Sequence, residues 1–188
     1  RSDEYFKHGN GWRGTWALDG GGSLTNQGIH AVDSLVWLCG DPTVTAARSG
    51  AFNHRIEGED LTLAILELPN GSPGLIMTTT CNHLGEELSS QQYVQSPFNP
   101  DFGVSISGTL GSASNLAVAG PEVRVKFEED GRDGLDAPIP DAPKSAVEDM
   151  VRVLRDGASP FVPGEEGVRS VRLAEEVYRV ARVRRTGN

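Results

Sequence analysis

Residues 20–40, GGGSLTNQGIHAVDSLVWLCG, decide the fold of this chain, because a run of three glycines leads directly into an amphipathic helix. Apolar residues recur at helical spacing in this stretch, and they are Ile29, Val32, Val36 and Cys39. This period predicts a helix of about residues 23–39 that buries one stripe of its surface. Asp41-Pro42 ends the helix, because the residue before a proline disfavours helical backbone angles.

The same helix carries the first candidate functional residues. Asn26 and His30 lie four residues apart, so their side chains are expected to be neighbours on the helix surface, and Asp33 follows one turn later. Imidazoles suit proton transfer near neutral pH, since their ordinary pKa is about 6.5. The structural alternative is that Thr25 or Asn26 caps the helix, His30 is a surface residue and the glycines form an ordinary turn.

The composition disfavours several classes of function. The chain has 188 residues, enough for one domain with its own core. Its 17 Lys and Arg against 26 Asp and Glu give a net charge of −9, which disfavours nucleic-acid binding. We recognise no membrane-spanning run and no signal peptide. We therefore expect a cytoplasmic protein in which Cys39 and Cys81 are buried free thiols.

The rest of the chain predicts an α+β fold. Residues 1–11 are polar and are expected to form an incoming loop. The predicted strands lie near residues 43–53, 60–68, 74–82, 103–108, 113–118 and 122–128. The predicted loops are 84–102 and 131–143, and the predicted C-terminal helices are about 144–157 and 165–184. Strands joined by short turns, such as Asn70-Gly71, indicate an open, mostly antiparallel sheet of about six strands with helices packed on one face.

Other sequence motifs point to no site of their own. GNGWRG at 9–14 matches G-x-G-x-x-G, but it lacks the preceding strand and following helix that a dinucleotide requires. The four histidines share no metal-ligand spacing with a cysteine or with one another, which predicts no metal site. No G-x-S-x-G element supports a serine hydrolase. The glycine run at 20–22 could hold an anion at the N-terminus of the following helix, although glycines alone are weak evidence.

Several segments of the chain together resemble one family. WRGTW at 12–16, expected as a strand, is followed by the glycine run and by a helix that reads N-x-G-x-H-x-x-D over 26–33. This order resembles the start of the C-terminal domain of the Gfo/Idh/MocA oxidoreductases, the glucose–fructose oxidoreductase and inositol dehydrogenase type. Further matching segments are EDLTLAILELPNG at 59–71, ISGTLGSA at 106–113 and GASPFVPGEEG at 157–167. The resemblance covers nearly the whole chain, and it implies that residues 1–188 are a single C-terminal substrate-binding and oligomerisation domain.

The resemblance also implies an activity that needs a second domain. Family members carry an N-terminal Rossmann domain that binds NAD(P) and supplies a catalytic lysine in an E-K-P motif, and neither feature is found here. We therefore expect an NAD(P)-dependent oxidoreductase in the full-length protein, acting on a hydroxyl of a sugar, cyclitol or nucleotide sugar. This chain alone is expected to be inactive and to bind no cofactor. The alternative is a non-catalytic oligomerisation or partner-binding module with the same fold.

Roles for individual residues follow from the same resemblance. His30 and Asn26 are implied to be catalytic, with His30 contacting the reacting hydroxyl and sharing the proton transfer with the absent lysine. Asn26 stands where many relatives have Asp, and it cannot ionise, which puts a His–Asp proton relay in doubt. Arg13, Tyr5 and Trp12 are the expected substrate-binding residues; the alternative for Arg13 is a structural salt bridge.

Partners are implied as well. In the family the free face of the sheet mediates dimer or tetramer contacts, so a homo-oligomer is expected here. A small sugar-type molecule is the expected substrate. The wording Asn-Gln-Gly-x-His at 26–30 is also found in relatives that act on nucleotide-linked amino sugars. No metal, nucleic acid or membrane is expected as a partner.

Overall fold

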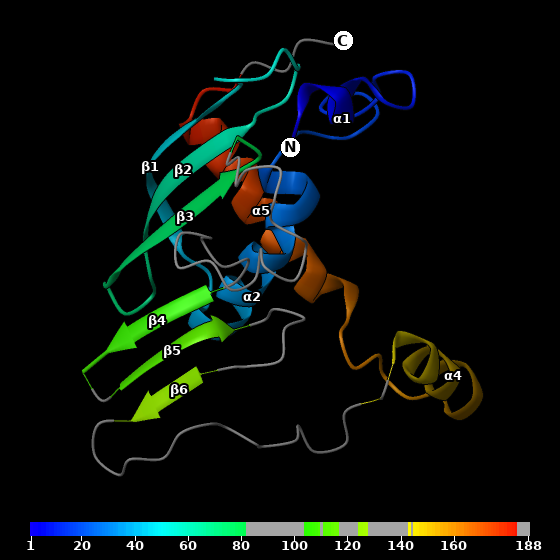
Figure 1. The fold of residues 1–188 in the computed structure, drawn as a ribbon. Helices are drawn as coiled ribbons and strands as arrows, with labels where there is room; N and C mark the ends of the chain where they lie inside the picture. The colour runs from blue at the N-terminus through cyan, green and yellow to red at the C-terminus, as the bar shows by residue number, and fades with distance from the viewer. Residues whose placement is uncertain (82–103, 110, 117–123, 128–142, 144, 184–188) are drawn as a thin grey trace.

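The computed structural model describes residues 1–81, 104–109, 111–116, 124–127, 143 and 145–183 (Figure 1). The helices are α1 (Asp3–Lys7), the π-helix η1 (Leu24–Gly28), α2 (Ile29–Cys39), α4 (Ala146–Asp156) and α5 (Gly164–Val180). The strands are β1 (Thr43–Gly50), β2 (Leu61–Glu67), β3 (Pro73–Thr79), β4 (Val104–Gly108), β5 (Gly111–Leu116) and β6 (Arg124–Phe127). The predicted loop at 84–102 lies outside the described residues, and so does the predicted loop at 131–143 apart from its last residue.

The strands form two antiparallel sheets of three strands each, in the orders β1-β2-β3 and β4-β5-β6. β2 pairs with both of its neighbours along its whole length. The α+β class and the antiparallel pairing are thus confirmed. A single sheet of about six strands is not found in the described part of the chain, where β3 and β4 belong to different sheets.

The core lies between the β1-β2-β3 sheet and two helices, α2 and α5, which cover one of its faces (Figure 1). Side chains alternate along β2, so Thr62, Ala64 and Leu66 are buried while Leu63 and Ile65 are exposed. The buried cluster consists of Leu24, Val32, Val36, Val44, Ala64, Leu66, Ile76, Leu173, Ala174, Val177 and Tyr178. One face of this sheet is therefore covered by helices, and the other is free within the described residues.

The predicted helix over 23–39 exists, but its first part is not an α-helix. Val32 and Val36 are buried as the apolar period predicted. Cys39 and Cys81 are free cysteines as expected, but both are half-buried rather than buried. Residues 24–28 instead form a π-helix, in which the N–H of Gly28 donates to the carbonyl of Ser23 at 2.9 Å. A Cβ on Gly28 would lie 2.6 Å from Cγ2 of Thr78, so this glycine allows η1 to approach β3 closely. Such π segments occur frequently at functional sites.

Two predictions about the N-terminal segment are wrong. Residues 1–11, expected as a loop, contain the short helix α1, which Ser2 caps by accepting a hydrogen bond from the N–H of Tyr5 at 3.4 Å. Residues 12–16, expected as a strand, form turns. The turns are stabilised because the N–H of Gly14 donates to Oδ2 of Asp19 at 2.7 Å and Gly14 adopts a positive φ of 71°. None of the described helices is long and apolar enough to cross a membrane.

Candidate functional site

Asn26 lies in η1, and its side chain is fixed by the segment that precedes the helix. Its Nδ2 donates to Oδ1 of Asp19 at 2.9 Å, and its Oδ1 accepts a hydrogen bond from Nε2 of Gln27 at 3.0 Å. Because the other carboxylate oxygen of Asp19 accepts the N–H of Gly14, Asp19 connects the N-terminal turns to the π-helix. We did not predict Asp19 as a site residue. Its one sequence signal is an acidic residue directly before the glycine run.

His30 lies in the first turn of α2, and its side chain is exposed. Its carbonyl accepts a hydrogen bond from the hydroxyl of Ser34 at 2.9 Å. The spacing of four residues between Asn26 and His30 predicted neighbours on an α-helix, but π-helical hydrogen bonds span five residues and change the alignment. The side-chain hydrogen bonds of Asn26 go to Asp19 and Gln27, so a direct pair with His30 stays a prediction.

The three predicted substrate-binding residues are brought together by the structure. The guanidinium carbon of Arg13 lies 4.7 Å from the ring centroid of Tyr5 and 4.8 Å from that of Trp12. The Nη1 of Arg13 donates to the carbonyl of His8 at 3.4 Å. Among the described residues Arg13 stacks on these two aromatic rings and forms no salt bridge. Each such cation–π contact at an exposed site contributes about 0.5–1 kcal/mol.

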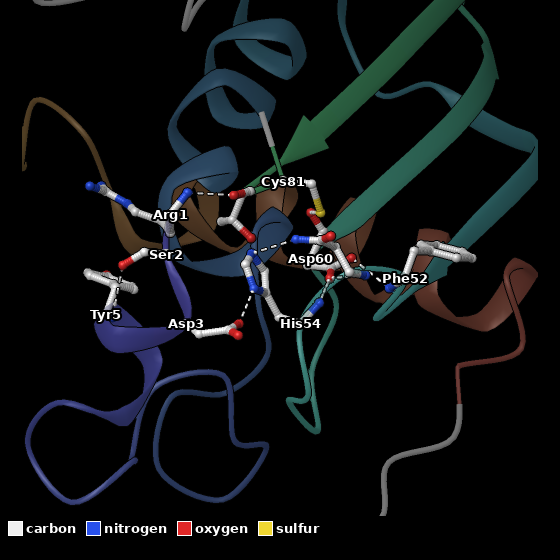
Figure 2. Close-up of polar contacts among 10 residues, drawn as sticks. Arg1, Ser2, Asp3, Tyr5, Phe52, His54, Asp60 and Cys81 are labelled. Atoms are coloured by element: carbon white, nitrogen blue, oxygen red, sulfur yellow. Dashed lines mark hydrogen bonds and ion pairs between the residues drawn. The ribbon is translucent and has the colours of Figure 1, made fainter. Parts of the chain in front are cut away.

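This cation–aromatic cluster, Arg13, Tyr5 and Trp12, is anchored to the rest of the fold through α1. Nδ1 of the buried His54 lies 2.9 Å from Oδ1 of Asp3 (Figure 2). The centroid of the Phe6 ring lies 4.8 Å from that of the His54 ring. The hydrogen bond with His54 lowers the pKa of the Asp3 carboxyl. α1 therefore has a defined attachment point on residues 52–54.

Residues 52–54 are in turn held by the fully buried carboxylate of Asp60. Its Oδ1 accepts the N–H of Phe52 at 2.8 Å, and its Oδ2 accepts the N–H groups of Asn53 at 2.8 Å and His54 at 2.7 Å (Figure 2). Burial raises the pKa of Asp60, but these hydrogen bonds together hold it below its ordinary value. Asp60 is thus an ionised anchor for the loop that fixes α1.

Asp60 also belongs to a group of side chains that could hold a metal ion. Potential ligand atoms of His54, Asp60 and Cys81 all lie within 4.8 Å of one another (Figure 2). The sequence spacing did not reveal this group, because its members come from three separate segments. Both carboxylate oxygens of Asp60 already accept backbone N–H groups, and Sγ of Cys81 donates to the Asp60 carbonyl at 3.4 Å. A metal would compete with these bonds, so we assign the group a structural role.

Comparison with known proteins gives the family. Residues 1–114 match the family model described as the GFO/IDH/MocA C-terminal domain. The chain belongs to the Gfo/Idh/MocA family of oxidoreductases, and these residues are its C-terminal domain. The resemblance seen in the sequence is therefore confirmed.

Individual relatives are named dehydrogenases. A D-apiose dehydrogenase from Rhizobium rhizogenes is 30% identical over 103 residues, which cover 52% of this chain and 27% of that protein. A D-apiose dehydrogenase from Paraburkholderia graminis is 25% identical over 171 residues, 85% of this chain and 42% of that protein. The crystal structure of the WlbA dehydrogenase from Bordetella pertussis in complex with NADH and UDP-GlcNAcA is 27% identical, with a TM-score of 0.67. That match covers 97% of this chain and 49% of the WlbA chain, so this chain spans at most about half the length of these relatives.

The role of Asp60 can be tested with the substitution Asp60→Asn. Because three backbone N–H groups, among them the buried one of His54, lose an ionised acceptor, the free energy of unfolding should fall by about 1–3 kcal/mol at neutral pH. Asp60 has a lowered pKa in the fold, so its contribution is present above the ordinary value of 3.8 and is lost as the pH falls through the folded pKa. The difference between variant and wild type should therefore shrink below about pH 4. Urea unfolding from pH 3 to 7 measures this, with the exposed Asp33→Asn as the control; equal stability at pH 7 would contradict the anchoring role.

Proposed function

We propose that this chain is the substrate-binding and oligomerisation domain of an NAD(P)-dependent oxidoreductase that acts on a hydroxyl of a sugar, cyclitol or nucleotide sugar. The observation that carries the proposal is the exposed His30 in the first turn of α2, directly after a π-helix whose Asn26 is fixed by Asp19. Membership of the family and the dehydrogenase names of the relatives support the same reading.

The nicotinamide cofactor belongs, in this proposal, to another part of a longer protein. The WlbA structure contains NADH and UDP-GlcNAcA, and this chain matches about half of it. Within this chain, GNGWRG at 9–14 lies in turns that follow α1 and precede further turns, so it lacks the strand and helix of a dinucleotide site. NAD or NADP, when bound, supplies or accepts the hydride.

The residues of this chain then orient the substrate and move a proton. Imidazoles exchange protons near neutral pH, and the exposed His30 is accessible to a hydroxyl of a bound molecule. Asn26 orients that hydroxyl by hydrogen bonding, and its pairing with Asp19 limits its rotation. The cation–aromatic cluster offers flat apolar rings and a guanidinium group, which suit the faces and hydroxyl or phosphate oxygens of a sugar or nucleotide sugar.

The proton-transfer role is tested by His30→Ala in the full-length protein. Turnover should fall by about 10²–10⁴-fold, the usual contribution of a general acid–base group. Folding should be unaffected, because the side chain is exposed. His8→Ala, which removes another exposed imidazole, is the matched control and should keep wild-type turnover. If His30→Ala also keeps it, the imidazole has no part in the reaction.

The oligomerisation role rests on the uncovered face of the β1-β2-β3 sheet. Leu63, Ile65, Leu75 and Met77 are 39%, 52%, 64% and 47% exposed on that face. Leu63 is paired with Met77 and Ile65 with Leu75 across β2 and β3, so the four side chains form one block. Contiguous apolar surface of this kind marks interaction sites, and we infer that a second copy of the chain covers it.

Ile65→Lys tests this interface. The wild-type chain should sediment as a dimer or larger species at micromolar concentration, whereas a lysine in the centre of the apolar block should give a monomer with unchanged circular dichroism. Val147→Lys, at an exposed apolar position on α4, is the control and should keep the wild-type assembly. A wild-type chain that sediments as a monomer would contradict the inferred interface.

A further inference from the structure

Glu59 is a fully buried glutamate whose side chain contacts the start of η1. It directly precedes β2, and its exposed fraction is 0%. Its Oε1 accepts the N–H of Leu24 at 2.6 Å, and its backbone carbonyl accepts the N–H of Ser23 at 3.0 Å. One residue thus binds two consecutive N–H groups at the beginning of the helix that carries Asn26.

This contact replaces a local helix cap. The first N–H groups of a helix have no partner within the helix, and a side chain at the N-cap position usually provides one. Ser23 occupies that position without such a bond, and its hydroxyl pairs instead with Oγ1 of Thr78 at 3.0 Å. The carboxyl group of Glu59, which is 35 residues away in the sequence, binds one of these N–H groups instead. Negative charge is also favoured at a helix N-terminus.

The glycine run is what allows Glu59 to reach this place. A Cβ on Gly22 would overlap the carbonyl group of Glu59, and a Cβ on Gly21 would overlap Oγ1 of Thr25. Gly21 also has a φ of 144°, which favours glycine. The N-terminus of the helix after the glycine run, where the sequence suggested a bound anion, is therefore occupied by the chain itself, through the carboxyl group of Glu59.

The buried surroundings of Glu59 disfavour ionisation of its carboxyl group. Oε2 is buried without a hydrogen bond of ordinary geometry within the described part of the chain. Burial raises the pKa of Glu59, and hydrogen bonds from the Leu24 N–H and other neutral groups, including the Tyr178 hydroxyl of α5, offset this only in part. The other acidic side chains nearby accept hydrogen bonds from different groups. Asp60 binds residues 52–54, Asp19 binds Gly14 and Asn26, and Glu57 binds the N–H of Trp16.

We propose that Glu59 is a positioning residue of the candidate site, which holds Leu24 so that η1 presents Asn26 to Asp19. A role of Glu59 in catalysis rests on the proposed function. The positioning of Asn26 is a property of this chain, and it can be tested without measuring enzyme activity. Both the protonated and the ionised carboxyl group can accept the Leu24 hydrogen bond. Ionisation, however, places a negative charge in a buried position. The hydrogen bond from Leu24 is itself stronger to the ionised carboxyl, but the cost of burying the charge is larger, so the folded state as a whole is favoured by protonated Glu59.

The pH dependence has a definite sign. A carboxyl whose pKa is raised in the fold contributes most to stability below its ordinary value of 4.5, and the contribution is lost as the pH rises through the folded pKa. This is opposite to Asp60, whose contribution is lost as the pH falls. The two adjacent carboxyls can thus be distinguished by titration.

Backbone hydrogen exchange on this chain tests the proposal with Glu59→Ala, Glu59→Gln and the control Glu67→Gln, which changes an exposed glutamate on β2. Glu59→Ala should speed exchange of residues 24–28 by about tenfold or more relative to β1–β3, because one buried hydrogen bond is lost. Glu59→Gln should keep wild-type protection, since its amide oxygen can still accept from Leu24. Unchanged exchange in Glu59→Ala, or an equal increase throughout the sheet, would overturn the proposal.

A second measurement decides the matter if Glu59→Ala fails to fold. The side-chain amide resonances of Asn26 should shift with pH in the wild type with a midpoint above 4.5. The shift should persist in Asp19→Asn, which removes the directly bonded carboxylate, and disappear in Glu59→Gln. A shift that disappears only in Asp19→Asn would overturn the proposal. Because these measurements involve no turnover, they stand apart from the outcome for His30→Ala.

Discussion

The constraint on which the rest of this structure depends is the direct backbone contact between the glycine turn and residues 57–60. Gly22 lies against the Glu59 carbonyl with no room for a side chain, and the N–H of Gly58 donates to the Gly14 carbonyl at 2.7 Å. Trp16 adds a third connection, since its Nε1 donates to the carbonyl of Glu57 at 2.9 Å. Because these bonds join the N-terminal turns to the start of β2, the position of η1 is fixed relative to the sheet.

Two adjacent carboxyls at this junction hold the two parts of the candidate site. The side chain of Glu59 binds the start of η1 and thereby acts on Asn26. The side chain of Asp60 binds residues 52–54, which fix α1 through the contact between His54 and Asp3. Glu59 and Asp60 are adjacent residues directly before β2, and their side chains bind different segments of the chain. The site is thus assembled from segments that meet at one end of β2.

Much of the fold could be predicted from the sequence because it follows from local patterns. The apolar period at Val32 and Val36 reflects burial on one face of the helix, and this prediction is confirmed. The apolar run over 60–68 correctly predicted a strand, but the exposure of Leu63 and Ile65 on its outer face was not expected. The π-helix could not be predicted, because it depends on the close approach of Gly28 to Thr78 in β3. The division into two sheets likewise depends on pairing between distant strands.

The candidate site was predictable only in part, for the same reason. Arg13, Tyr5 and Trp12 were expected from the family resemblance, and the structure groups them by cation–π contacts. Asp19 and Glu59 were not expected, because each acts on a backbone or side-chain group that only the folded chain brings near. A buried carboxyl that caps a distant helix leaves no spacing signal in a single sequence.

The central claim, that the contact between Gly22 and Glu59 positions the site, is tested most directly by the free energy of unfolding of Gly22→Ala. The added methyl group must displace the Glu59 carbonyl, so the account predicts a loss of about 3 kcal/mol, the upper range for overpacking a tight site. Gly167→Ala, in the open interior of α5, is the matched control and should be neutral or stabilising. A Gly22→Ala variant within about 0.5 kcal/mol of the wild type would contradict the account.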